Sequence, residues 1–274
     1  MKYKKLVSQI ESLPPLLDTA DIVRRLYSDG MQNVNLSRLT LAIESDALLS
    51  ANILKMINSP FYGFSRKITS VSQAVTLFGS ELIFALVVRF SIQTNIVANL
   101  RAYGLSNDKF NEICHLQSRL VSDWQTKVDR HFAAFLSPLA LIMESGKLIF
   151  SKEIALAGEI KEFSKGLESA QSITLYEHEL FGTSSYYICG LLFEHWNLNE
   201  EYIKILKALD YEHENIEELS TEINILDAVR SAINVKEQLS EASLGSAVEI
   251  VEEMGQSVDL FLSAAKNLKK MRRV

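Results

Sequence analysis

Apolar positions recur along most of this chain with the period of an α-helix. One example is a set of four residues spaced i, i+4, i+7 and i+8 on a single helical face: Leu49, Ile53, Met56 and Ile57. Similar patterns follow one another along the chain, and no stretch shows the strict alternation that is typical of a half-buried strand. We therefore predict an all-α protein.

The stretch from Ser45 to Val88 contains the clearest helix boundaries. Its first helix should end at Asn58 and Ser59, because Pro60 lacks an N–H group and disfavours the α conformation of the residue before it. We interpret Asn58 and Ser59 as residues whose side chains bond to the exposed groups at this helix end. A polar dyad in a binding pocket is the alternative interpretation.

Two further helices follow in the same part of the chain. The first should begin at Ser70, which can form a capping box with Gln73, and it should end near Gly79. The second, from Glu81 to about Leu100, is apolar on most of its circumference. We therefore expect this helix to run through the middle of a domain.

The composition favours the same fold class. The chain has 274 residues, of which only 11 are Gly and 4 are Pro, so few residues oppose helix formation. With 47% hydrophobic residues, it can bury one large core or two smaller ones.

Charge is divided unevenly along the sequence. Residues 1–105 hold 11 Lys and Arg against 7 Asp and Glu, a net charge of +4, whereas residues 106–274 hold 17 against 27, a net charge of −10. This asymmetry and the turn-forming residues around Gly104 predict two tightly packed helical subdomains, 1–105 and 106–274. The basic residues do not form a clustered face with interleaved aromatic residues, so we do not expect nucleic-acid binding.

The sequence is typical of a cytoplasmic chain without membrane insertion. Its longest convincing apolar run, Leu82–Val88, ends at Arg89 and is far shorter than the ~18 residues that a membrane-spanning helix needs. The basic N-terminus is not followed by the apolar segment of a signal peptide. Cys114 and Cys189 lie in apolar helical patterns, and we interpret both as buried free thiols.

Two motifs stand out in the first half of the chain: Leu13-Pro14-Pro15-Leu16 and Asn58-Ser59-Pro60-Phe61-Tyr62-Gly63. Together with Ile68-Thr69-Ser70 and Leu77-Phe78-Gly79, they resemble the HDOD domain, the HD-related output domain of bacterial signalling proteins. The resemblance covers roughly residues 13–209 and implies a multi-helix HDOD/HD-like fold whose N-terminal subdomain is specific to this family. Asp46-Ala47 stands where the family usually has Asp-Pro.

This resemblance also implies a function. In bacteria, HDOD domains occur beside or fused to receiver, diguanylate cyclase and phosphodiesterase domains, which indicates a regulatory role through protein–protein contacts. Signalling proteins that bind this chain in trans are the expected partners, and their contacts are expected near the motif residues Asn58, Ser59, Phe61, Tyr62 and Gly63. The motif prolines Pro14 and Pro15 belong to the same candidate set.

The second half resembles a metal-dependent phosphohydrolase of the HD superfamily, in which imidazole and carboxylate groups hold one or two metal ions. The positions that match the metal ligands differ from the family pattern: Gln117, Met143, Glu144, Ser185, Leu209 and Asp210. Only Asp227 keeps the residue that the late ligand position requires. We therefore predict no metal at these positions, no cofactor and no enzymatic activity.

The alternative is that the ancestral pocket still binds a nucleotide, for example a cyclic dinucleotide, or retains a residual phosphohydrolase activity. Arg119 and Lys147 are the candidate contacts for a phosphate group. Otherwise, both residues are ordinary surface side chains. Metal analysis would separate an enzyme from a sensor, and the dependence of partner binding on added nucleotide would separate a sensor from a scaffold.

Overall fold

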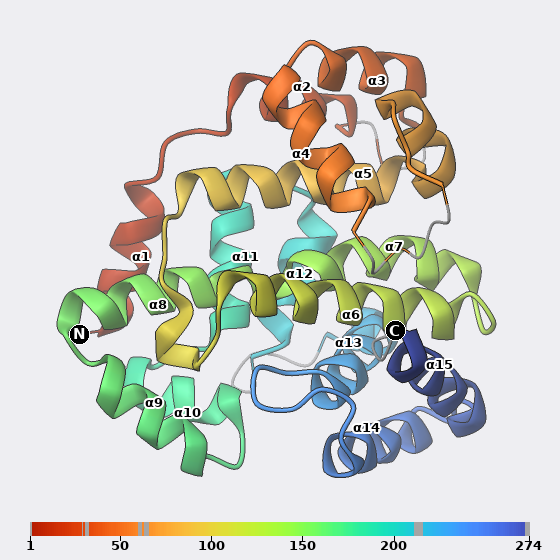
Figure 1. Cartoon of the computed structure of the whole chain (residues 1–274). Coiled ribbons are helices and arrows are strands. Elements are labelled where there is room, and N and C mark those ends of the chain that lie inside the picture. Colours follow the sequence, from red (N-terminus) through yellow and green to blue (C-terminus); the bar gives the residue numbers. More distant parts are fainter. Residues whose placement is uncertain are drawn as a thin grey trace. The chain divides into compact units, whose positions relative to one another are not determined.

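The computed structural model describes residues 2–28, 30, 33–59, 62, 66–210 and 216–271. These residues form helices and the turns that connect them. Within them, the only β-type pairing is an isolated bridge between Ile233 and Gln238. This architecture confirms the all-α prediction (Figure 1).

The helices form two compact units. One unit is Pro14–Asn95, and the other combines Met1–Leu13 with Ile96–Val274. The predicted ranges 1–105 and 106–274 divide the chain differently at residues 1–13 and 96–105. The reason is packing, because the first helix and the 3₁₀ turn just before residue 104 contact helices of the second unit.

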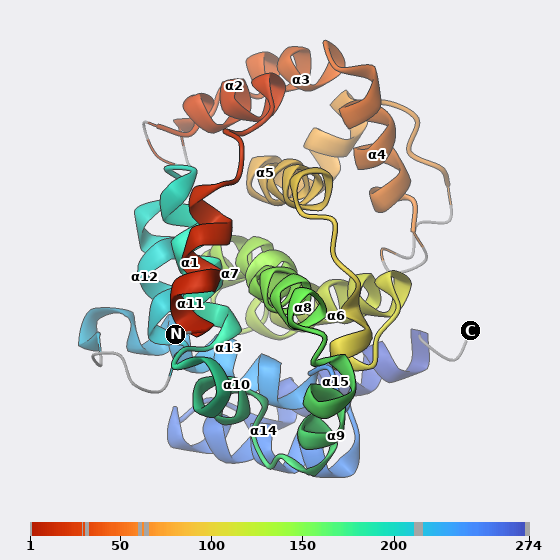
Figure 2. The same ribbon diagram turned by 90° about the vertical axis from the view of Figure 1, so that its left-hand side faces the viewer.

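In the unit Pro14–Asn95, three shorter helices pack around one long helix, which Figure 2 shows nearly end-on. The long helix is α5, Val71–Asn95, and the shorter ones are α2 (Asp18–Leu26), α3 (Leu36–Glu44) and α4 (Ala47–Ile57). Ile83, Phe84 and Leu86 of α5 are almost completely buried, as expected for a helix in the middle of a domain.

Helix α5 contains the predicted interruption. Gly79 has φ 78° and ψ 166°, outside the helical region and at a positive φ that glycine adopts without strain. The N-terminal cap is also present, since the Gln73 N–H donates to Ser70 Oγ at 3.2 Å. The Gln73 side chain accepts from Thr69 N–H instead of Ser70 N–H, and the helix ends at Asn95 instead of about residue 100.

Asn58 closes the segment that follows α4. Its amide nitrogen donates to the carbonyl oxygens of Leu54 at 2.7 Å and Ile68 at 2.8 Å, and its side-chain oxygen accepts from the Ile68 N–H at 2.8 Å. The side chain therefore satisfies a helix-end carbonyl and holds together both ends of the family motif. Tyr62 packs edge-on against Phe78, with ring centroids 4.9 Å apart.

The remaining motif residues that the structure describes are Pro14, Pro15 and Ser59, and they do not form one continuous surface patch. Pro14 and Pro15 are exposed in the connection between the first two helices, and Ser59 is half-buried. Phe61 and Gly63 lie outside the described residues. The contacts expected at this motif therefore stay predictions.

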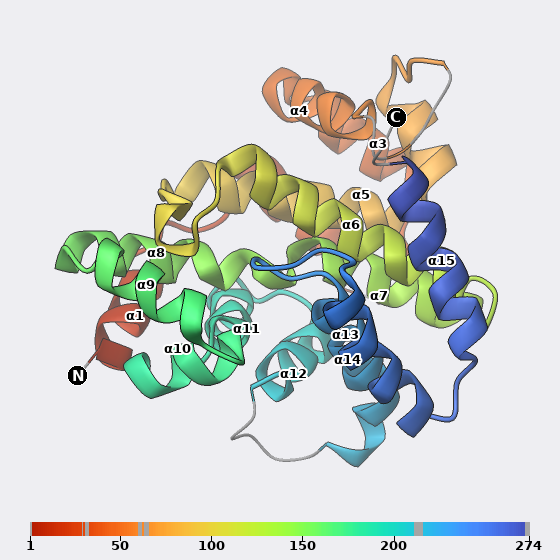
Figure 3. The same cartoon turned by 60° about the horizontal axis from the view of Figure 1, so that its bottom comes forward.

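The second unit carries most of the chain, and Figure 3 shows its C-terminal helices. Its first part comprises α1 (Lys2–Glu11), η3 (Leu100–Tyr103), α6 (Asn107–Gln125), α7 (Arg130–Ile142), η4 (Met143–Ser145), α8 (Gly146–Ala157) and α9 (Ile160–Ser169). Its second part comprises α10 (Ile173–Phe181), α11 (Ser185–His195), α12 (Glu200–Ala208), η5 (Glu217–Leu219), α13 (Ser220–Ala232), α14 (Glu241–Glu253) and α15 (Val258–Met271).

Pairs of neighbouring helices build the core of this unit. Helix α6 packs on α7, α11 on α12, and α13 on α14, while α1 contacts α8 and α11. Helix α15 returns to α6, where the rings of Phe261 and Trp124 meet edge-on at 5.0 Å and are both fully buried. These contacts join the helices of this unit into one compact body.

Two segments are long and apolar enough to cross a membrane by length and composition, Val71–Asn95 and Arg130–Ala157. In the structure, 67% and 83% of their most apolar windows are buried, as in core helices of a soluble protein.

Candidate functional site

A cluster of buried polar side chains lies where η4 and the start of α8 pack on the start of α11. Gly146 permits this close approach, because a Cβ atom at this position would lie only 1.8 Å from the carbonyl oxygen of Ser185. As a result, Glu144 and Lys147 on one segment meet Ser185 and Tyr186 on the other.

The Lys147 ammonium is the centre of this cluster. Its Nζ lies 2.7 Å from Glu144 Oε2 and donates to Ser185 Oγ at 2.9 Å. Glu177 Oε1 is 3.8 Å away, and the Tyr186 ring centroid is 4.5 Å away. Only 1% of the Lys147 side chain is exposed, so these groups replace water around its charge.

Glu144 is held by neutral donors on its other oxygen. Its Oε1 accepts from Gln117 Nε2 at 2.8 Å and from the Tyr186 hydroxyl at 2.9 Å. Gln117 Nε2 also donates to the carbonyl oxygen of Ile233 at 2.8 Å, which ties the cluster to the end of α13. The carboxylate is thus fixed from α6, α8 and α11 at once.

Glu177, on α10, is the second carboxylate of the cluster. It accepts from the Tyr103 hydroxyl at 2.7 Å and from the Ser185 N–H at 2.7 Å. The second bond satisfies a free donor at the N-terminus of α11, where a negative charge is favourable. We name the set of seven residues the lysine cluster: Tyr103, Gln117, Glu144, Lys147, Glu177, Ser185 and Tyr186.

The two central charges stabilise each other. Burial alone would lower the pKa of Lys147, but Glu144, Tyr186 and Glu177 outweigh burial and raise it above its ordinary value. Burial alone would raise the pKa of Glu144, but the Lys147 ammonium and the hydrogen bonds from Gln117 and Tyr186 hold it below its ordinary value. Both residues are therefore charged at neutral pH.

A sequence model of the HDOD domain matches residues 13–214. The chain belongs to the HDOD family. This finding confirms the resemblance inferred from the motifs, and a search of the curated proteins finds no match.

Solved structures extend the similarity to the whole HDOD chain. A virulence factor from Campylobacter jejuni subsp. jejuni is 26% identical, with 98% of this chain and 96% of that chain covered and a TM-score of 0.59. A protein from Shewanella amazonensis SB2B, provisionally named a phosphohydrolase, is 16% identical with 97% and 94% covered and a TM-score of 0.70. A protein from Marinobacter aquaeolei VT8, provisionally named a signal transduction protein, is 18% identical with 98% and 62% covered and a TM-score of 0.67. At these identities, the last two show the fold alone.

The structure brings together three of the positions that match HD metal ligands. Gln117, Glu144 and Ser185 all belong to the lysine cluster, and Met143 beside them is completely buried. The remaining positions have other contacts. Leu209 is buried in the core, Asp210 accepts from the Ser184 N–H at 3.1 Å, and Asp227 pairs with Arg230.

The residues of this HDOD protein do not fit a divalent metal at the matched positions. An ammonium group lies between Glu144 and Ser185, and its positive charge would repel a metal ion at hydrogen-bond distance. The thioether of Met143 and the hydroxyl of Ser185 are also poor ligands for Mg²⁺, Mn²⁺ or Fe. Among the described residues, no three His, Cys, Asp or Glu side chains are grouped so that they could hold a metal ion.

The two predicted phosphate contacts have other partners. Arg119 pairs with Asp123 at 2.7 Å on the surface of α6. Lys147 is buried, so the interpretation of Lys147 as a surface side chain is wrong. Its contact with Glu144 explains why a lysine can lie inside the protein.

Sequence reasoning did not select Glu177, Tyr103, Tyr186 or Arg230. The spacing of Glu144 and Lys147 at i and i+3 was the available signal, because such a pair lies on one face of a helical turn. Glu177 and Tyr103 come from distant parts of the chain, and nothing local links them to Lys147.

Proposed function

We propose that this HDOD protein is a non-catalytic regulatory module of bacterial signal transduction, acting in the cytoplasm through contacts with signalling proteins in trans. The observation that carries the proposal is the position of the Lys147 ammonium among the residues that match HD metal ligands. It supports a centre in which a cation of the chain itself stabilises the carboxylates that a metal would otherwise bind.

Electrostatics supports the non-catalytic part of this proposal. A metal ion could bind only if it displaced the Lys147 ammonium or if Lys147 first lost its proton. The raised pKa of Lys147 opposes this loss of a proton. Without a metal, the cluster offers no group that could activate water against a phosphate ester. A residual phosphohydrolase or a cyclic-dinucleotide sensor would need Lys147 to contact a phosphate group. The Lys147 ammonium already contacts Glu144 and Ser185 within the cluster.

A hydrolysis assay tests the non-catalytic part of this proposal. The purified chain would be incubated with bis-p-nitrophenyl phosphate without metal and in separate reactions with added Mg²⁺, Mn²⁺ or Fe²⁺. The metal content of the purified chain would also be measured. The expected result is no metal-dependent rate above that of the variant Glu144→Gln. A metal-dependent rate that Glu144→Gln abolishes would contradict the proposal.

Exposed leucines of the unit Pro14–Asn95 provide the means to test protein contacts. Leu41 on α3 is 67% exposed and Leu48 on α4 is 65% exposed, whereas Leu156 of the other unit is 72% exposed and serves as a matched control. Tagged wild-type protein would be cross-linked in its native cells and its captured proteins identified by mass spectrometry.

The expected result is a reproducible set of signalling proteins that is depleted for Leu41→Ser or Leu48→Ser and retained for Leu156→Ser. A captured set identical to that of an unrelated acidic helical protein would contradict the role in protein contacts.

A further inference from the structure

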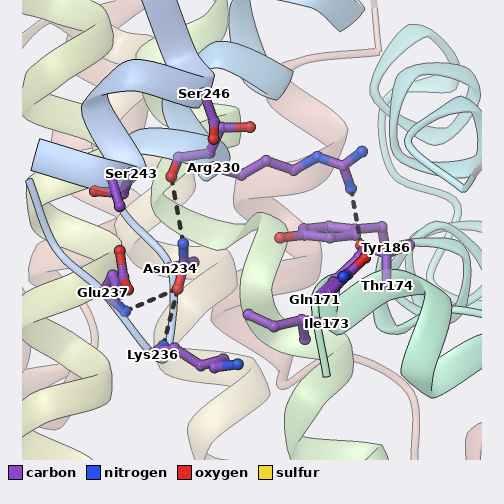
Figure 4. A pocket seen from close by; sticks show the side chains of 13 residues that line it. Gln171, Ile173, Thr174, Tyr186, Arg230, Asn234, Lys236, Glu237, Ser243 and Ser246 are labelled. Carbon is purple, nitrogen blue, oxygen red and sulfur yellow. Dashed lines mark hydrogen bonds between the residues drawn. The ribbon is translucent and has the colours of Figure 1, made fainter. Parts of the chain in front are cut away.

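A polar pocket of about 350 Å³ lies beside the lysine cluster, between the start of α10, the end of α13 and the start of α14 (Figure 4). Its volume lies in the range that small-molecule sites occupy. Five of its lining residues carry hydroxyl groups on aliphatic side chains: Ser172, Thr174, Ser231, Ser243 and Ser246. Gln171 and Asn234 add two amides.

Arg230, which is ion-paired with Asp227, forms one wall of this pocket. Its guanidinium carbon lies 4.5 Å from the centroid of the Tyr186 ring, and its Nε pairs with Asp227. Its Nη1 reaches Thr174 Oγ1 at 3.4 Å, a long contact that a ligand oxygen can replace (Figure 4). Because the Asp227 and Tyr186 contacts fix the planar fork, little side-chain entropy would be lost when an anion binds it.

Lys236 provides a second positive charge at the pocket. Its Nζ donates to the carbonyl oxygens of Ala170 at 2.7 Å and Glu168 at 3.2 Å, which orient the ammonium without neutralising it. Among the residues that the structure describes, no carboxylate pairs with Lys236. An anionic ligand would supply the missing countercharge.

The helix starts that line the pocket favour an anion as well. Ile173 and Thr174 are the first residues of α10, and their backbone N–H groups lie at the positive end of that helix. Two carboxylates oppose an anion: that of Glu237, which is exposed and lines the same pocket, and that of Asp227, which pairs with Arg230. The balance of charges predicts moderate affinity that falls with increasing salt.

The rest of the pocket indicates what the anion is attached to. Among the lining residues that the structure describes, Tyr186 is the only aromatic one. This residue is 4% exposed and its ring is already covered by Arg230, so it offers no platform to stack a nucleobase. The side chains of Gln171, Ser231 and Ser246 are suited to hydrogen bonds with several hydroxyls of a ligand, whereas the Asn234 oxygen and the Ser243 hydroxyl already bond to backbone groups. We propose that the pocket binds a small phosphate monoester with a hydroxylated body, of the sugar-phosphate class.

This proposal does not rest on the proposed function, because its charged contacts, Arg230 and Lys236, lie outside the lysine cluster and its assay is different. Isothermal titration calorimetry of the full chain would use ribose 5-phosphate as the probe, with ribose and inorganic phosphate as separate titrants. The expected result is ribose 5-phosphate binding with a Kd below ~1 mM, weaker binding of inorganic phosphate and no binding of ribose. Failure of ribose 5-phosphate to bind, or equal binding of inorganic phosphate, would overturn the proposal.

Surface variants assign the binding to this pocket without threatening the fold. Lys236→Met removes an exposed charge, and we expect it to weaken binding about tenfold, the usual effect of losing one charge-assisted bond. Glu237→Gln removes one opposing charge, and we expect it to strengthen binding about threefold.

Lys266→Met and Glu252→Gln change the net charge equally at exposed positions outside the pocket lining and should leave the affinity unchanged. Equal effects of Lys236→Met and Lys266→Met would show that only net charge matters and would overturn the proposed site.

Discussion

Replacement of Lys147 by Met tests the electrostatic account of the lysine cluster most directly. Methionine has a similar length and no charge, so the substitution leaves Glu144 and Glu177 buried without their ammonium partner. Breaking a buried ion pair by removing one partner costs about 3–5 kcal/mol. A second route to the same magnitude is the proton that Glu144 would take up to become neutral.

The cost of that proton follows from the ordinary pKa of a glutamic acid. Protonation of a carboxyl group with a pKa of about 4.3 costs about 3.7 kcal/mol at pH 7, at 1.36 kcal/mol for each pH unit. We therefore expect Lys147→Met to lose between 3 and 4 kcal/mol of unfolding free energy at pH 7, roughly the range given by both routes.

This mechanism also predicts a dependence on pH. A buried carboxyl without its ammonium has a raised pKa in the folded state, so the deficit of Lys147→Met shrinks as pH falls toward the unfolded pKa. Between pH 7 and pH 5, the deficit should decrease by about 2.7 kcal/mol. Urea unfolding followed by circular dichroism at both pH values measures it.

The double variant Lys147→Met with Glu144→Gln is the control, because it removes the charge from both partners. It should recover most of the stability that Lys147→Met loses at pH 7. A loss below about 1 kcal/mol in the single variant, or an equal loss at pH 5 and pH 7, would refute this account of the cluster.

Three further predictions concern neighbouring residues. Gly146→Ala should lower the free energy of unfolding in urea by about 3 kcal/mol, since the new Cβ would lie 1.8 Å from a backbone oxygen. The control Gly245→Ala, whose Cβ would have no atom within 4 Å, should raise it by about 0.5–1 kcal/mol. Equal effects of the two substitutions would contradict the close approach at Gly146. Burial raises the pKa of the Cys189 thiol to about 12, and Cys114 is buried as well. Ellman's reagent at pH 8 should therefore label neither cysteine until urea unfolds the chain. Rapid labelling of the folded protein would contradict this burial. Because the pKa of Glu144 is lower in the folded than in the unfolded state, its carboxylate stabilises the fold at pH values above the unfolded pKa. This stabilisation is lost as the pH falls through the pKa of the folded state. Below about pH 4.3, the unfolding free energy of Glu144→Gln should therefore fall less steeply with decreasing pH than that of the wild-type protein. An unchanged pH dependence would contradict the lowered pKa of Glu144.

Local patterns predicted the helices well because their signals lie within one or two turns. The apolar period, the Ser70 cap and the interruption at Gly79 all depend on adjacent residues, and the structure contains each of them. The end of α5 was less predictable, since the segment after Asn95 remains apolar although it leaves the helix. Boundaries of this kind depend on packing, which a local pattern does not contain.

The candidate site was only partly predictable for the same reason. The match to HD enzymes identified Gln117, Glu144 and Ser185, which do meet in space. Lys147 was interpreted as a surface residue because lysine is rarely buried, and its second carboxylate neighbour, Glu177, is thirty positions away in sequence. Only the tertiary fold shows that a cation of the chain occupies the centre of this group.

The lysine cluster also has a consequence for the evolution of this protein. A metal centre at the positions that match HD ligands would require the loss of Lys147 and new ligands at Gln117 and Ser185. The first step alone would remove several kcal/mol from a fold whose total stability is about 5–15 kcal/mol. Loss of Lys147 while Glu144 stays charged would thus be selected against, so we expect these two positions to change together during evolution.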